Sequence, residues 1–146
     1  MAGTPDESPD VAGRRERLVA LCQALPEAEA ERAGVQHLAF KVRKKIFAYY
    51  VYDHHRDGRI AVLCKAPPGE QSRLVEEDPH RYFVPPYVGR KGWVGLRLDS
   101  RRVDWKAVKE LVFVAYVLTA PDTLRQRSGD AKSARAGRLR RRPTMR

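Results

Sequence analysis

The sequence predicts an α+β fold, a two-layer sandwich in which helices cover one face of an antiparallel sheet of about five strands. Three observations lead to this prediction. Three segments with strand character follow one another between residues 38 and 65 and are joined by short turns, which makes the strands antiparallel. Residues 93–98 alternate apolar and other side chains, as a strand with one buried face does. Residues 105–120 carry apolar side chains at helical spacing, and the expected order is α-β(3)-α-β(2)-α.

The first 35 residues contain one clear element. Residues 1–13, MAGTPDESPDVAG, offer little to bury and predict a disordered tail. From Arg14 to Pro26, four apolar residues recur at spacings of three and four and predict a helix: Leu18, Leu21, Cys22 and Leu25. The stretch EAEAERAGVQ that follows is helix-friendly in composition but confined between Pro26 and Gly34, and we interpret it as a connection with a short strand or turn.

Three strands are predicted next, within HLAFKV, KIFAYYVY (45–52) and RIAVLCK (59–65), all rich in branched and aromatic residues. The second turn contains Asp57-Gly58, a pair that suits a hairpin with positive φ at its glycine. The first turn has only Arg43 and Lys44. Neither residue is favoured in a two-residue hairpin, so this turn is expected to be longer or strained.

The second half begins with a short exposed helix within residues 67–78, followed by an extended piece near residues 82–84. In the strand at 93–98, Val94, Leu96 and Leu98 share the face expected to meet the core. The last helix is capped by Asp104 and ends before Pro121. Residues 122–146 lack periodicity and predict a disordered basic tail, so the folded domain is expected at 14–121.

The charge of the chain is strongly positive, with 29 lysines and arginines against 18 acids and a net charge of +11. Residues 14–121 alone carry +7, so the domain itself should attract polyanions, nucleic acid first. Cys22 and Cys64 fit no metal-binding spacing and are typical of buried thiols in a reducing compartment. No apolar run has membrane-spanning length, and the N-terminus lacks the bases of a signal peptide. We therefore expect a cytoplasmic protein without a membrane partner.

The usual catalytic signatures are missing from the sequence. GRKGWVG enters a strand, whereas a phosphate-binding loop must open a helix. His54 and His55 are neighbours on a predicted turn and stand at no ligand spacing from a cysteine. Cys64 lies in an apolar strand, where an inert thiol is the better interpretation. The sequence therefore predicts no catalytic residue, metal or cofactor, and a non-enzymatic function.

Basic residues interleaved with aromatic ones form the remaining constellation. Cations at exposed hairpin tips reach phosphates, and an aromatic ring on a strand can stack on a base. The ordinary alternatives are that the cations only keep a sheet edge soluble and that the tryptophan is core, and for the tryptophan we favour core. The candidate nucleic-acid-binding residues are Arg43, Lys44, Lys45, Lys65, Arg90, Lys91, Trp93 and Arg97.

Four segments, taken in order, resemble the MmcQ/YjbR-like family of small bacterial proteins: FKVRKKIFAYY, GRIAVLCK, YFVPPYVGRKGWVGLRLD and VDWKAVKELVFVAYVLTAP. The similarity covers about residues 18–121. It implies a domain of α-β(3)-α-β(2)-α type, described as a double wing and suspected of binding DNA, with wings at 42–45 and 87–93. Arg43 and Lys44 stand where the family often has glycine, and the Arg-rich tail is an addition.

The same topology is loosely similar to frataxin and to secretion chaperones. Iron binding of the frataxin type requires an acidic ridge on the first helix, whereas GRRERLVALC has three arginines and one glutamate. We therefore expect a monomeric DNA-binding protein of low sequence specificity, with RNA as a further possible partner. The alternative is a chaperone-like, protein-interaction or small-ligand module that uses the open sheet face.

Overall fold

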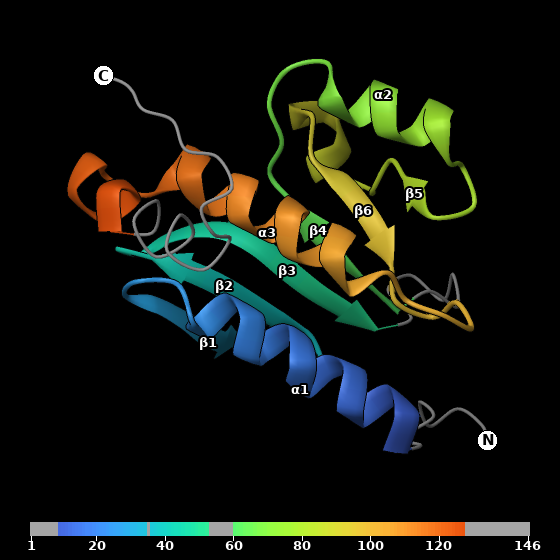
Figure 1. Cartoon of the computed structure of the whole chain (residues 1–146), viewed down its shortest axis with the longest axis horizontal. Helices are drawn as coiled ribbons and strands as arrows, with labels where there is room; N and C mark the ends of the chain where they lie inside the picture. Colours follow the sequence, from blue (N-terminus) through green and yellow to red (C-terminus); the bar gives the residue numbers. More distant parts are fainter. Residues whose placement is uncertain (1–8, 35, 53–59, 128–146) are drawn as a thin grey trace.

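The computed structural model describes residues 9–34, 36–52 and 60–127 (Figure 1). The predicted Asp57-Gly58 turn, His54, His55 and the Arg-rich end of the chain lie outside these residues. One antiparallel sheet has the strand order β1-β2-β3-β4-β6-β5, and α1 and α3 lie across the same face of it (Figure 1). The strands are β1 (Ala28–Arg32), β2 (Leu38–Val42), β3 (Lys45–Tyr52), β4 (Ile60–Cys64), β5 (Tyr82–Phe83) and β6 (Val94–Arg97); the helices are α1 (Pro9–Gln23), α2 (Glu70–Glu77), the 3-10 helix η2 (Val88–Lys91) and α3 (Trp105–Thr119).

The predicted α+β sandwich is confirmed, with six strands in the described chain where about five were expected. The additional strand is β1. It lies within residues 27–36, which the sequence analysis interpreted as a connection with a short strand or turn. It pairs along its whole length with β2, from Ala28 opposite Val42 to Arg32 opposite Leu38. Alternation explains the pairing, because Ala28 and Ala30 pack on the main core while the glutamates between them are exposed.

Helical residues extend beyond both predicted domain boundaries, residues 14 and 121. The first helix begins at Pro9 and not at Arg14, consistent with the preference of proline for the first helical position. At the other end, residues 122–127 are helical and Leu124 is only 1% exposed, within the main core. The sequence did not indicate the C-terminal extension, because a single apolar side chain among charges gives no periodic pattern.

The main core fills the space between the sheet and the two long helices. Val94, Leu96 and Leu98 belong to it, as their alternation predicted. A smaller second cluster lies on the opposite sheet face and contains Phe83 and Trp93. Phe83 lies directly on Gly95, where an added Cβ would come within 2.4 Å of the ring. The sheet therefore has buried side chains on both faces, and not on one alone.

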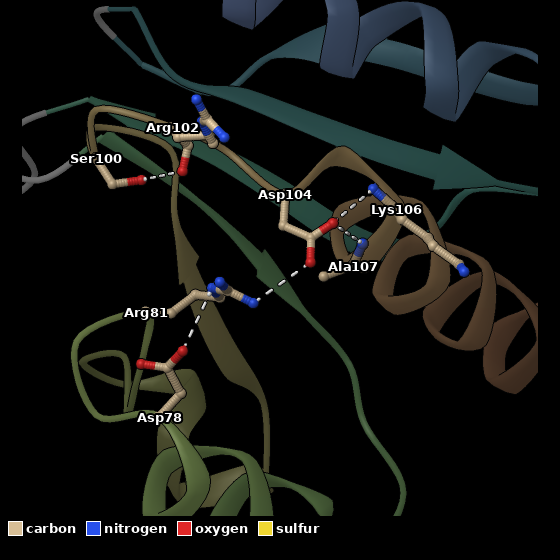
Figure 2. Close-up of polar contacts among 7 residues, drawn as sticks. All are labelled: Asp78, Arg81, Ser100, Arg102, Asp104, Lys106 and Ala107. Carbon is tan, nitrogen blue, oxygen red and sulfur yellow. Dashed lines mark hydrogen bonds and ion pairs between the residues drawn. The ribbon is translucent and has the colours of Figure 1, made fainter.

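Two local features fix how the strands meet α3. Phe40 opposes Ala48 while Lys41 opposes Ile46, so Phe47 is an extra residue in β3 that forms a β-bulge. At the start of α3, Asp104 accepts hydrogen bonds from the amides of residues 106 and 107 at 3.1 and 3.2 Å, which confirms the predicted cap. Arg81 joins this carboxylate to Asp78, at 3.5 Å from each (Figure 2).

Candidate nucleic-acid interface

The β2–β3 turn holds the first predicted basic tip. Arg43 and Lys44 are its two central residues, with φ of 52° and 70°. Positive φ at both positions is the mark of a type I′ turn, whose twist matches a tight hairpin. The turn is therefore short, and the absence of asparagine or glycine makes it mildly strained.

Arg43 is held by an acid and is not free to reach a ligand. Its Nε and Nη2 donate to Glu27 Oε1 and Oε2 at 2.5 and 3.1 Å. The hydrogen bond from this guanidinium lowers the pKa of the Glu27 carboxyl. Sequence reasoning missed the pair because sixteen residues separate its members. Arg43 thus braces the turn against the segment before β1.

Two more cations, Lys45 and Lys65, share the end of the sheet that carries this turn. Lys45 begins β3 and is exposed. Lys65 directly follows β4, and its amide donates to the bulge carbonyl of Phe47 at 3.2 Å. The pairing of Cys64 with both Ala48 and Val94 places the end of β4 beside the start of β6. The register therefore brings Lys65 near Lys45 and near the segment that enters β6.

Arg90 and Lys91 lie in that segment, on η2 and not on a hairpin tip. Both are exposed, and Gly92 closes the helix with a φ of 89°. The Gln71 side chain, from α2, donates to the carbonyls of Gly89 and Trp93 at 2.9 and 2.6 Å. These bonds fix the segment that presents the two cations.

Neither Trp93 nor Arg97 is placed for binding, and for Trp93 this is the core position that the sequence analysis favoured. Trp93 is 6% exposed and packs against Tyr49 with 5.7 Å between ring centroids, so it is a core residue and not a stacking platform. Arg97 ends β6, away from the turn, and its guanidinium donates to both oxygens of Asp99 at 3.0 Å. Burial and pairing remove both residues from the candidate site.

Tyr87 is the exposed aromatic residue next to the cations, and sequence reasoning did not select it. Its side chain is 69% exposed. Its φ of 65° and ψ of −71°, with a 2.7 Å hydrogen bond from the Val88 amide to the Pro86 carbonyl, define a γ-turn of positive φ, which is rare and strained. The Arg90 amide donates to the Tyr87 carbonyl at 3.3 Å, so ring and cation leave the same turn.

We call the five cations that the register gathers the sheet-end cluster: Lys44, Lys45, Lys65, Arg90 and Lys91. Glu27, the acid beside the turn, is already engaged by Arg43. The cluster offers positive charge and hydrogen-bond donors for phosphate oxygens. In the described part of the chain, no three His, Cys, Asp or Glu side chains form a metal site. Burial raises the pKa of both thiols, Cys22 and Cys64, which leaves them protonated.

The fold and the cationic end define the class first: a small α+β domain with an antiparallel sheet and a basic end. The sequence model of the YjbR family matches residues 23–118, and the chain belongs to that family. The crystal structure of Deinococcus radiodurans protein DR2400, which carries the domain DUF419, has the same fold with a TM-score of 0.62. That comparison covers 79% of this chain and 87% of the other at 22% identity. No curated protein matches the sequence.

No helix in the described ranges is long and apolar enough to cross a membrane.

Proposed function

We propose that this protein binds nucleic acid, DNA first, through the phosphate backbone and with low sequence specificity. One observation carries the proposal: the strand register brings five cations to one end of the sheet, where the nearby acid is already paired. Such a cluster suits a row of phosphates, because each cation that neutralises a phosphate releases counterions. The cations are lysine and arginine side chains on a turn, a strand end and a short 3-10 helix, which makes backbone contact the natural mode.

Tyr87 adds an aromatic surface beside these cations. An exposed ring within reach of a phosphate-binding cluster can stack on an unpaired base, whatever that base is. In this proposal Tyr87, and not Trp93, is the residue that stacks on a base. Tyr87→Ala should weaken binding to single-stranded DNA more than binding to a duplex, whereas Tyr87→Phe should retain both.

The alternative use of the open sheet face has less support. A protein-binding or ligand-binding face needs an accessible apolar concavity. The apolar residues of this face are buried in the cluster around Trp93 and Phe83. Strands β1 and β2 carry charged side chains on this face, including Glu31 and Lys41, which form an ion pair. Non-enzymatic binding at the sheet end is therefore the function that we propose.

The test measures anisotropy of a short fluorescent duplex with two variants of the full chain that remove equal charge. One variant changes Lys44, Lys45, Arg90 and Lys91 to Gln. The control changes four exposed arginines outside the cluster to Gln: Arg32, Arg73, Arg125 and Arg127. The first variant should lose affinity by more than about tenfold relative to the control at low salt. Equal affinities of the two variants would refute a specific role for the sheet end.

The same measurement on a chain that ends at Arg127 isolates the contribution of the basic tail. Truncation there keeps Leu124 in the core. We expect lower affinity for every polyanion, because the tail supplies further cations. The difference between the cluster variant and its control should persist in this shorter chain. If it disappears, the tail and not the domain carries the binding.

A further inference from the structure

A second group of cations lies at the opposite end of the domain. The segments 11–17 and 97–106 contain seven lysines and arginines against three acids. The first segment belongs to α1, and the second ends β6 and leads into α3. We call five of these cations, which lie on α1, on the loop and on the first turn of α3, the helix-end cluster: Arg15, Arg17, Arg101, Arg102 and Lys106.

Arg14 is the residue that brings the two segments together. Its Nη1 donates to the carbonyls of Leu98 and Ser100 at 2.7 Å each, and its Nη2 donates to the carbonyl of Arg101 at 3.2 Å. The Arg17 guanidinium lies 4.6 Å from the centre of the Trp105 ring. Arg14 therefore fixes the loop against α1, Arg17 packs on the first residue of α3, and the loop brings Arg101 to the same place.

The acids of the loop are occupied by other partners. Asp99 is paired with Arg97 at 3.0 Å. Asp104 caps α3 and faces Arg81, while the Lys106 side chain extends away from that carboxylate (Figure 2). Glu16 is the remaining acid of the two segments. Because three acids do not neutralise seven cations, the cations repel one another. Binding of an anionic partner offsets that repulsion.

The two clusters lie at opposite ends of the central strands. The sheet-end cluster is located where β3 begins and β4 ends. The amide of Leu98 instead bonds the carbonyl of Ile60, which opposes Tyr52, so the loop lies where β3 ends and β4 begins. The eight residues of β3 span roughly 26 Å at about 3.3 Å per residue. The two ends face away from each other, so a duplex that lies across one end of the sheet does not reach the cations at the other end.

We propose that the helix-end cluster is a second phosphate-binding surface, and that one protein molecule bridges two separate nucleic-acid segments. The cations come from a helix and a loop, which suits a line of phosphates better than one small anion. This inference rests on the proposed function, because the sheet end makes the first of the two contacts. It goes beyond that function by adding an architectural role that one binding surface does not provide.

The test is a bridging assay with the full chain. One duplex is fixed to beads, and recovery of a second, fluorescent duplex is measured alongside anisotropy with a single duplex in solution. The test variant changes Arg15, Arg101 and Arg102 to Gln. These substitutions keep the main-chain oxygen that accepts from Arg14. The control changes Arg32, Arg73 and Arg125 to Gln and removes the same charge elsewhere.

The test variant should reduce recovery of the second duplex about tenfold or more, while its affinity for a single duplex stays within about threefold of the control. Unchanged bridging would overturn the inference, since the tail or a dimer would then supply the second contact. Equal losses in the variant and the control would also overturn it, as would a selective loss of binding to phosphatidylserine vesicles with bridging intact. Failure of the proposed function looks different: the sheet-end variant and its control would then bind a single duplex equally.

Discussion

Removal of one carboxylate should increase the affinity for DNA by releasing an arginine. In the structure both guanidinium contacts of Arg43 go to Glu27, and both side chains are about half exposed. In Glu27→Gln the uncharged amide no longer holds the guanidinium, which then joins the sheet-end cluster. One additional phosphate contact steepens the dependence of log affinity on log salt by about 0.9. Between about 200 and 50 mM salt, the variant should gain roughly 3.5-fold more affinity than the unaltered protein does.

Glu29→Gln is the matched control, because it removes the same charge from the exposed side of the neighbouring strand β1. The assay is anisotropy of a short duplex over a salt series, with thermal melting as a check of folding. If the two variants show the same salt slope, the gain in affinity reflects net charge alone and Arg43 plays no part.

An acid titration of protein stability gives a second readout of the Glu27–Arg43 pair. The pKa of Glu27 is lowered in the folded protein, so the pair's contribution to stability is present above the unfolded pKa and is lost as pH falls through the folded one.

Three further predictions concern the fold. Lys44→Gly should raise the free energy of unfolding by about 1 kcal/mol in urea titrations, because glycine adopts the φ of 70° without strain; a lower value would contradict the strain. Leu124→Ala should cost about 2–5 kcal/mol in the same measurement, and a negligible loss would return residues 122–127 to the tail. Because burial raises the pKa of Cys22 and Cys64, a thiol reagent at mildly alkaline pH should react only as the protein unfolds. Rapid labelling of the folded protein would show that these thiols are accessible.

Local pattern was enough to predict most elements. Apolar alternation in the late strand selected the buried face correctly, and Asp104 caps the last helix where the sequence placed it. The pattern left the first strand undecided between strand and turn, because its alanines and glutamates have low strand propensity and pair only because β2 and α1 lie beside them. It also gave no sign of the C-terminal extension, where a single buried residue, Leu124, adds to the core.

The candidate site was predictable in composition and less so in detail. The sequence selected Lys44, Lys45, Lys65, Arg90 and Lys91, and the register brings all five to one end of the sheet. It also selected Trp93 and Arg97, of which one is buried and the other is paired with an acid. The exposed aromatic residue beside the cations is instead Tyr87. No local sequence pattern indicated the γ-turn that presents it.

By itself, the sequence determined the order of helices and strands, the excess of positive charge and the family to which the chain belongs. These follow from neighbouring residues, whose periodicity and composition need no distant partner. Only the tertiary structure decided which cations are available. Arg43 is held by Glu27 and Arg14 by the loop around Ser100, and each of these contacts joins residues far apart in the chain. The availability of a charge depends on such contacts, because an acid or carbonyl within hydrogen-bond distance occupies the donors that a phosphate would need.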